Sequence, residues 1–355
     1  MNKMDQQTLS AVDAKFEAQK IAFAPIFFQA LVAMRDLGVM KYIYEKRGKA
    51  TVKEIPGALG LTKYAVDVML EAAEVMDVVE IEEGKVKVTK IGFYLLRDEM
   101  TRVNINFIND VCYEGAKEMT ASLKETRPAG LKVFGDWPTV YEGLSELDQD
   151  VRKSWLEFDH FYSQDAFDAA LEIVFSENPD YIFDIGGNTG KWSFKVCEYR
   201  DSVKVKILDL PGQIAMAKKN VEERSLQDRI DFHPINILDK EQLVPQGADA
   251  IWMSQFLDCF SKEEILQILK NCYQAASDDT CVYIMEPFID NQKFPAAEFS
   301  LVGTSLYFTI IANGNSKMYK IQVMRDLCNE AGFEVVEEFP LIADSYHTIL
   351  KLKKK

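Results

Sequence analysis

The sequence predicts an α/β protein in which a doubly wound, Rossmann-like domain follows a smaller, mainly helical N-terminal domain. The main observation is the run Tyr181–Lys191, YIFDIGGNTGK, where a short apolar strand breaks into glycines and then enters a helix. A second apolar strand follows at Val203–Leu208, and strands alternate with helices from there on. The 355 residues also exceed one ordinary core, which predicts two domains.

The C-terminal half continues this alternation. Further strands are expected at Ile230–Asn236, Ala248–Phe256, Cys281–Phe288, Phe333–Phe339 and His347–Leu352. Helices are expected between them, notably at Lys262–Ala275 and Lys320–Ala331. This order predicts a mostly parallel sheet whose ligand binds at the carboxyl ends of the strands.

Composition excludes several classes of protein. The chain is 48% hydrophobic and 27% charged, as soluble globular proteins are, and its net charge of −15 argues against binding to a nucleic-acid backbone. The apolar stretch Ile21–Ala33 is interrupted by Pro25 and Gln29, so neither a signal peptide nor a membrane span is expected. Scattered cysteines without a C-x-x-C pair predict reduced thiols in a cytoplasmic protein, with no metal site.

The glycine turn indicates which ligand it binds. Its glycines are Gly186, Gly187 and Gly190. They do not form the G-x-G-x-x-G pattern of dinucleotide sites, and Trp192 after Lys191 excludes a P-loop. Asp184, two residues before the first glycine, would repel a pyrophosphate and attract an ammonium group. S-adenosylmethionine, a cationic amino acid joined to adenosine, fits this pattern; a turn that binds no ligand is the alternative.

A second carboxylate supports that ligand. The strand Val203–Leu208 runs into Asp209-Leu210-Pro211, and an acid about 20 residues beyond the glycine turn commonly holds a ribose diol. The segment Asp184–Gly190 followed by Asp209–Pro211 resembles the S-adenosylmethionine-dependent small-molecule O-methyltransferases of the plant caffeate and bacterial polyketide type. The resemblance spans nearly the whole chain, and it implies S-adenosylmethionine as the cofactor.

The resemblance also implies a domain plan and a cofactor site. Residues 1–100 would form a winged-helix dimerisation domain, 101–165 a helical linker contributing to the substrate pocket, and 166–355 the methyltransferase domain. Asn236 and Ile237 stand where the family contacts adenine, while Ser254 and Gln255 end a strand near the sulfonium. The implied cofactor-binding set is Asp184, Gly186, Gly187, Gly190, Asp209, Leu210, Asn236, Ile237, Ser254 and Gln255.

The N-terminal region has a winged helix-turn-helix pattern. Helices are expected at Pro25–Met40, Thr51–Leu59 and Thr62–Met76, followed by a hairpin, Val78–Ile81 with Val86–Thr89. A ligand-sensing transcriptional regulator is one hypothesis, which a salt-dependent gel shift would test. However, Lys63 is the only base between Leu61 and Val79, and four acids there would repel DNA phosphates. By resemblance, the module forms a homodimer.

The segment between the two domains is rich in aromatic residues. By resemblance, it roofs a pocket for a small aromatic substrate. His160 is a lone histidine within it, and its ring either serves packing or faces the substrate as a second catalytic candidate.

The catalytic run departs from the family pattern. Where the family has Leu-His-Asp-Trp with a general-base His, this chain has Leu257-Asp258-Cys259-Phe260, so Asp258 holds the base position. A free carboxyl has a pKa of about 4 and a phenol one of about 10, but burial raises the pKa of a carboxyl. Three hypotheses follow: O-methylation with Asp258 positioning or deprotonating a phenol, C- or N-methylation, and cofactor binding without methyl transfer.

Overall fold

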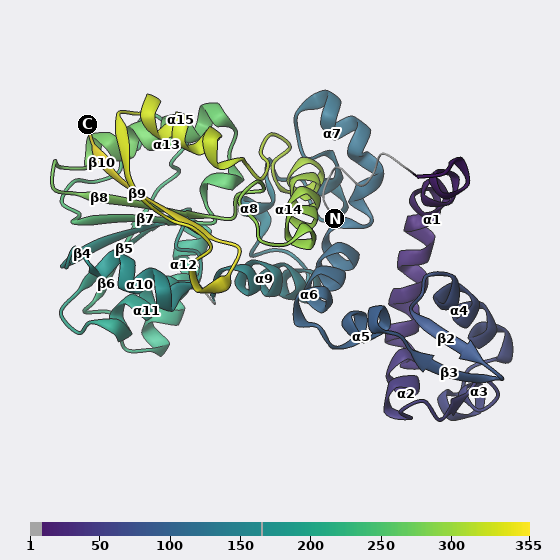
Figure 1. Cartoon of the computed structure of the whole chain (residues 1–355). Helices are drawn as coiled ribbons and strands as arrows, with labels where there is room; N and C mark the ends of the chain where they lie inside the picture. Colours follow the sequence, from purple (N-terminus) through teal and green to yellow (C-terminus); the bar gives the residue numbers. More distant parts are fainter. Residues whose placement is uncertain (1–8, 165) are drawn as a thin grey trace. The chain divides into compact units, whose positions relative to one another are not determined.

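The computed structural model describes residues 9–164 and 166–355. The chain divides into two compact units, the first ending at Asn109 and the second beginning at Asp110 (Figure 1). The short turn η2 (Ile108–Cys112) spans this boundary along the sequence.

The first unit combines helices with a three-stranded antiparallel sheet ordered β1-β3-β2. Its strands are β1 (Ala50–Thr51), β2 (Val79–Glu82) and β3 (Lys85–Val88), and its helices are α1 (Ala11–Asp36), α2 (Val39–Glu45), α3 (Ile55–Leu59), α4 (Lys63–Val75), α5 (Lys90–Arg97) and α6 (Glu99–Phe107). Met34, Ile43, Leu70 and Val86 meet in one buried cluster, so the apolar faces of α1, α2 and α4 pack against the sheet. The predicted hairpin and the helix before it are confirmed.

Two predictions for this unit were wrong. The helix expected at Pro25–Met40 is part of α1, which begins at Ala11 because the Ser10 side chain accepts the N–H of Asp13 at 3.1 Å. Pro25 lies inside α1, and the helix stops where Gly38 takes a left-handed conformation with φ of 77°. The helix expected at Thr51–Leu59 is shorter, since Ala50–Thr51 pairs with β3 as a strand.

The second unit contains a seven-stranded sheet ordered β6-β5-β4-β7-β8-β10-β9. The first five strands are mutually parallel, whereas β10 runs antiparallel to both of its neighbours. The strands are β4 (Tyr181–Ile185), β5 (Lys204–Asp209), β6 (Ile230–Pro234), β7 (Ala250–Ser254), β8 (Cys281–Glu286), β9 (Phe333–Phe339) and β10 (Thr348–Lys354). Every strand predicted from the sequence is present, and the sheet is mostly parallel as predicted.

Helices and short turns make up most of the rest of this unit. Before the sheet come η3 (Gly115–Glu118), α7 (Met119–Glu125), η4 (Ala129–Val133), α8 (Val140–Gly143), α9 (Gln149–Gln164) and α10 (Phe167–Phe175). Between and after the parallel strands come α11 (Lys191–Tyr199), α12 (Pro211–Glu223), η5 (Leu257–Cys259), α13 (Lys262–Ala275), α14 (Pro295–Tyr307), η6 (Phe308–Ala312), α15 (Ile321–Glu330) and η7 (Ile342–Asp344).

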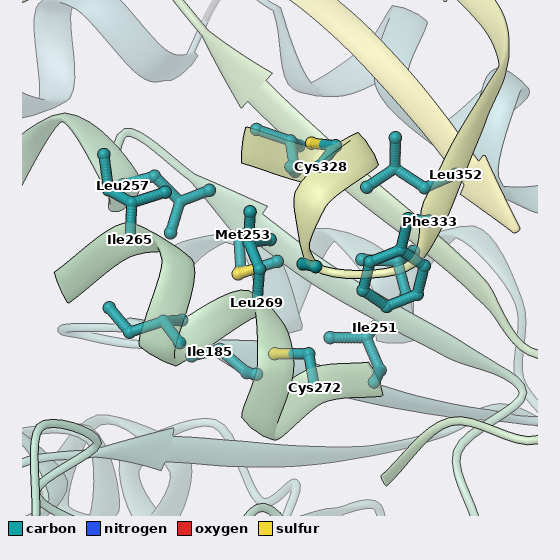
Figure 2. Packing of buried hydrophobic residues seen from close by; sticks show 14 of the residues in the cluster. Ile185, Ile251, Met253, Leu257, Ile265, Leu269, Cys272, Cys328, Phe333 and Leu352 are labelled. Carbon is teal, nitrogen blue, oxygen red and sulfur yellow. The ribbon is translucent and has the colours of Figure 1, made fainter. Parts of the chain in front are cut away.

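Helices cover both faces of the sheet, so the unit is doubly wound (Figure 1). Successive residues of β4 point to opposite faces: Phe183 joins a core with α13 and α15, while Ile182 joins a core with α10, α11 and α12. Figure 2 shows the first of these cores, where Ile265 and Leu269 of α13 meet side chains of the sheet. The fold class predicted from the sequence is therefore confirmed.

Pro295–Ala312 is long and apolar enough to cross a bilayer, and 44% of that window is buried inside the protein. A core helix passes the same test, so a single stretch of this kind is weak evidence for a membrane span. Among the described residues, no three or more His, Cys, Asp or Glu side chains are placed to hold a metal ion.

Candidate active site

Four adjacent parallel strands end at one edge of the sheet, three of them in a polar residue. Adjacent strands in the order β5, β4, β7 and β8 end at Asp209, Ile185, Ser254 and Glu286, and parallel strands end at the same edge. The glycine turn follows β4 directly, and η5 with Asp258 follows β7 after two residues. The predicted cofactor site and the predicted base therefore lie at one edge of one sheet, as the switch-point rule for doubly wound folds requires.

The glycine turn depends on left-handed backbone. Gly186 has φ of 75° and Gly190 has φ of 88°, values that residues with a Cβ rarely adopt. Asn188 has φ of 48° and donates its N–H to Asp209 Oδ2 at 2.8 Å. This bond ties the turn after β4 to the end of β5. The two acids predicted from neighbouring strands are therefore part of one connected turn.

Asp184 is buried beneath this turn. Its Oδ2 accepts the Ser193 hydroxyl at 2.6 Å, which joins β4 to the first turn of α11. A Cβ on Gly187 would lie 2.8 Å from the same oxygen, so this position must be glycine for the carboxyl to sit there. Burial raises the pKa of Asp184 to about 7, and the nearby charge of Asp209 adds to the shift. A cationic ligand group would favour the ionised form of this carboxyl.

Asp209 retains hydrogen-bonding capacity for a diol. Its Oδ2 accepts Asn188 N–H, and its Oδ1 accepts Leu210 N–H at 2.7 Å. A carboxylate offers about four lone-pair sites, so these two bonds leave one on each oxygen. Burial raises the pKa of Asp209 to about 6. Leu210, also in the predicted set, reaches this carboxyl through its backbone.

The two residues predicted to contact adenine, Asn236 and Ile237, offer few free atoms to a ligand. Asn236 is exposed, and its Oδ1 already accepts the N–H of Leu238 at 3.2 Å. One lone pair of that oxygen is left for an adenine amino group. Ile237 is 6% exposed and packs in the core shared with α13, so little of its side chain is open to a ligand.

At the end of β7 and in the turns that follow β4 and β7, the buried polar atoms without a hydrogen-bond partner among the described residues include Asn188 Oδ1, Ser254 Oγ and Gln255 Oε1. Buried polar groups are almost always paired, so such atoms need a ligand or water. They lie after β4 and at the end of β7, where the cofactor is expected. These atoms and the two acids together fit a ligand with several polar groups, as S-adenosylmethionine has.

Phe256 joins the glycine turn to the loop that carries Asp258. A Cβ built on Gly186 would lie 2.2 Å from Phe256 Cδ2, so the ring packs directly on this glycine. Replacing Gly186 by Ala should weaken S-adenosylmethionine binding by about tenfold or more, because both φ and the clash oppose the side chain. Calorimetry on Gly186→Ala tests this. Gly212→Ala is the control, since no atom lies within 4 Å of a Cβ there.

Asp258 is fixed within η5 by its neighbour Leu257. Leu257 is fully buried in the same core as Ile185 and Met253 (Figure 2). Asp258 itself is 5% exposed, and burial raises its pKa to about 7, with the charge of Asp159 contributing. Cys259 Sγ lies 3.4 Å from Asp258 Oδ1 and donates weakly to it. Burial thus moves this carboxyl toward the pKa of a useful general base.

Two acids beside Asp258 were not predicted. Burial raises the pKa of Asp159, on α9, to about 6, while the nearby Lys191 charge opposes this shift. Asp159 Oδ2 lies 3.5 Å from Asn188 Nδ2. Glu286 ends β8, and burial and Asp258 raise its pKa well above the usual range. The sequence does contain a signal for Glu286: like Asp184, it is an acid at or near the end of an otherwise apolar strand. Asp159 carries no comparable signal in the sequence.

His160 lies beside Asp159. Its Nε2 lies 3.9 Å from Asp159 Oδ2, and burial together with the Lys191 charge lowers its pKa to about 4. His160 is therefore neutral at pH 7 and lies toward the glycine turn. Its role as a catalytic residue stays a prediction.

Two sequence families match the chain. Residues 120–334 match the O-methyltransferase domain, and residues 15–86 match the Dimerisation2-like domain. Among curated proteins, L-tyrosine C(3)-methyltransferase of Streptomyces lavendulae is 25% identical over 317 residues, covering 88% of this chain and 85% of that protein.

Solved structures share the fold across both units. The S-adenosylmethionine-dependent methyltransferase SibL in its apo form matches with a TM-score of 0.71 at 22% identity, covering 94% of this chain and 98% of SibL. The O-methyltransferase NcsB1 from neocarzinostatin biosynthesis, in complex with S-adenosylmethionine and 2-hydroxy-5-methyl naphthoic acid, matches with a TM-score of 0.63 at 19% identity, covering 92% and 96%. With its glycine turn, paired acids and N-terminal dimerisation domain, this chain belongs to the O-methyltransferase family and is an S-adenosylmethionine-dependent methyltransferase.

Proposed function

We propose that the enzyme methylates a small aromatic acceptor that carries a phenolic hydroxyl, and that Asp258 accepts the phenolic proton. The observation that carries this proposal is the burial of Asp258 at the edge of the sheet, next to the glycine turn, with its pKa raised to about 7. A proton acceptor is most effective when its pKa lies near the working pH.

In this proposal each site residue has a separate role. Asp184 would hold the cofactor amine, Asp209 the ribose hydroxyls, and Asn236 with Ile237 the adenine. When bound, S-adenosylmethionine supplies a methyl group whose bond to sulfur breaks as the acceptor bond forms, the electron pair staying on sulfur. Asp258 takes the phenolic proton on a carboxylate oxygen, which leaves the acceptor as the stronger phenolate nucleophile. Fixing acceptor and cofactor side by side supplies most of the remaining rate.

Two acceptor atoms are candidates. The phenolic oxygen is the first prediction from the sequence, and the name of NcsB1 as an O-methyltransferase supports it. The ring carbon ortho to the hydroxyl is the second, and the name of the Streptomyces lavendulae L-tyrosine C(3)-methyltransferase favours it. A phenolate is nucleophilic at both atoms, so the same proton transfer to Asp258 serves either reaction. In C-methylation the ring also loses its own proton, which passes to solvent after the new bond forms.

The remaining parts of the proposal concern assembly and location. We infer a homodimer formed through the N-terminal domain, with domain limits at 1–100, 101–165 and 166–355, in the cytoplasm. Exposed apolar side chains along α1 support the dimer; they include Val12, Phe16, Ile21, Phe23 and Ile26. Obligate dimers bury apolar surfaces of this kind.

A single labelling experiment tests the proposed reaction. The purified protein is incubated with methyl-labelled S-adenosylmethionine and a panel of phenols that includes L-tyrosine, and the labelled product is identified by NMR. Label on the oxygen or on the ortho carbon supports methyl transfer to a phenol and decides between the two atoms. Label on an amine nitrogen, or tight cofactor binding without product from the panel or from an extract of the host, contradicts it.

A further inference from the structure

Lys191 places a positive charge beside the glycine turn. It is the first residue of α11 and directly follows Gly190, the last glycine of the turn. Two residues of α9 lie within reach of its charge, which lowers the pKa of His160 and opposes the rise in the pKa of Asp159. Asp159 Oδ2 in turn lies 3.5 Å from Asn188 Nδ2, so α9 approaches the turn at this point. Lys191 is therefore a cation between α9 and the glycine turn.

The charge of Lys191 is not used in an ion pair. Its side chain is half-buried, and burial lowers the pKa of the amine, while the charge of Asp159 opposes that shift. Even so, no ion pair closer than 4.0 Å joins Lys191 to another residue in the parts of the chain that the structure describes. Lys195, one turn further along α11, has such a partner in Asp168 at 3.0 Å. Charges removed from water are usually paired, so an anionic group of a ligand would be bound favourably by the Lys191 amine.

The cofactor carries such a group. The amino-acid end of S-adenosylmethionine has an ammonium and a carboxylate on the same carbon atom, so both must be bound in one part of the site. The carboxyls of Asp184 and Asp209 suit the amine and the ribose, and both would repel the carboxylate. Helix α11 has no side-chain cap at its N-terminus, and its dipole favours an anion there. A cation at the first position of this helix complements the negative half of the amino-acid end.

We propose that the Lys191 amine binds the carboxylate of S-adenosylmethionine, while Asp184 binds the ammonium group on the same carbon atom. This inference rests on the place proposed for the cofactor amine at Asp184 and is independent of the proposed role of Asp258 as proton acceptor. Lys191 then selects for a cofactor that carries the carboxylate. Decarboxylated S-adenosylmethionine keeps the adenosine, sulfonium, methyl and amine groups, so it is the ligand that reports this one contact.

Calorimetry with three ligands measures the contact without turnover. Wild type should bind decarboxylated S-adenosylmethionine about tenfold or more weakly than S-adenosylmethionine, because a hydrogen bond between charged groups commonly contributes that much. Lys191→Met should weaken the binding of S-adenosylmethionine and of S-adenosylhomocysteine by about tenfold, since both carry the carboxylate, and should change the affinity for the decarboxylated compound by less than about threefold.

Two further variants serve as controls. Lys191→Arg keeps the charge, so its preference for the carboxylated cofactor should stay within about threefold of wild type. Lys195→Met removes one positive charge from the same helix, at an exposed ion pair that contributes little, so it should bind all three ligands as wild type does.

The ratio of the two affinities separates this contact from other roles of Lys191. The inference is overturned if Lys191→Met weakens all three ligands equally, since the amine would then serve the turn or Asp159. Unchanged binding of all three also overturns it, as does a loss confined to the KM of the acceptor. Should Lys191→Met fail to fold, Lys191→Gln supplies the neutral side chain, and a wild type that binds both cofactors equally overturns the inference in any case. Normal turnover of Asp258→Asn would instead overturn the proposed function, a separate result.

Discussion

Replacing Asp258 by Asn should lower kcat by about tenfold or more, since a positioned general base contributes about 10²–10⁴-fold. The affinity for S-adenosylmethionine should barely change, because the residues expected to hold the cofactor amine and ribose, Asp184 and Asp209, are untouched. Asn keeps the shape and burial of the side chain but cannot take the phenolic proton. Single-turnover kinetics with labelled cofactor and calorimetry measure the two quantities separately.

The pH dependence gives this prediction a sign. Asp258 must be deprotonated to act, and burial raises its pKa to about 7. Wild-type kcat/KM should therefore be low in acid and increase as the pH is raised through about 7. The Asp258→Asn variant should lack this acidic limb. Glu263→Gln is the matched control, an exposed acid in the first turn of α13 that should keep both rate and profile. An Asp258→Asn enzyme with a wild-type rate would remove this carboxyl from the mechanism.

The glycine turn and the two acids beside it could be predicted from the sequence because their signals are local. An acid inside an otherwise apolar strand, as Asp184 is, has no packing explanation, and glycines beside it mark a turn of unusual backbone. Helix α13 was equally accessible: Ser261 and Glu264 form a capping box, and the predicted bounds Lys262–Ala275 match the observed ones. Where one short segment contains both the cause and the effect, sequence reasoning succeeds.

The placement of other acids beside Asp258 could not be predicted, because it depends on sheet order: an acid at a strand tip does not say which turn it meets. Glu286 lies 28 residues after Asp258 in the chain, and only the pairing of β8 with β7 brings it under the same turn. Asp159 reaches the glycine turn from α9, whose periodicity alone does not say which neighbour each face meets. The antiparallel direction of β10 also depends on sheet order, because β10 lies between β8 and β9 and pairs with both.

Helix α1 shows a different limit. A proline usually stands in the first turn of a helix or interrupts one, so the sequence favoured a helix that starts at Pro25. In the structure, α1 begins at Ala11 and continues through Pro25. The side chains before Pro25 include exposed apolar ones such as Phe16 and Ile21, so no packing within one chain reveals that they form a helix.

Asp184→Asn should abolish measurable S-adenosylmethionine binding and at the same time stabilise the free protein at pH 8. An unfolded Asp has a pKa of about 3.9, and burial raises that of folded Asp184 to about 7. For an acid with a raised folded pKa, stability is fully present below the unfolded pKa and is lost as pH rises through the folded one. Wild type should therefore lose stability between about pH 4 and pH 7, and Asn, which stays neutral, should not.

Thermal unfolding at two pH values and calorimetry test both halves of this prediction. The Tm of Asp184→Asn should equal that of wild type near pH 4 and exceed it by about 3 °C or more at pH 8. Binding of a cationic amine requires the ionised carboxylate, so wild type should release a proton on binding S-adenosylmethionine at pH 6, seen as buffer-dependent heat. Glu198→Gln, an exposed acid on α11, should behave as wild type in both assays. Normal affinity in Asp184→Asn would mean that the amine is held elsewhere, and the unpaired atoms Ser254 Oγ and Gln255 Oε1 would then be the groups to examine.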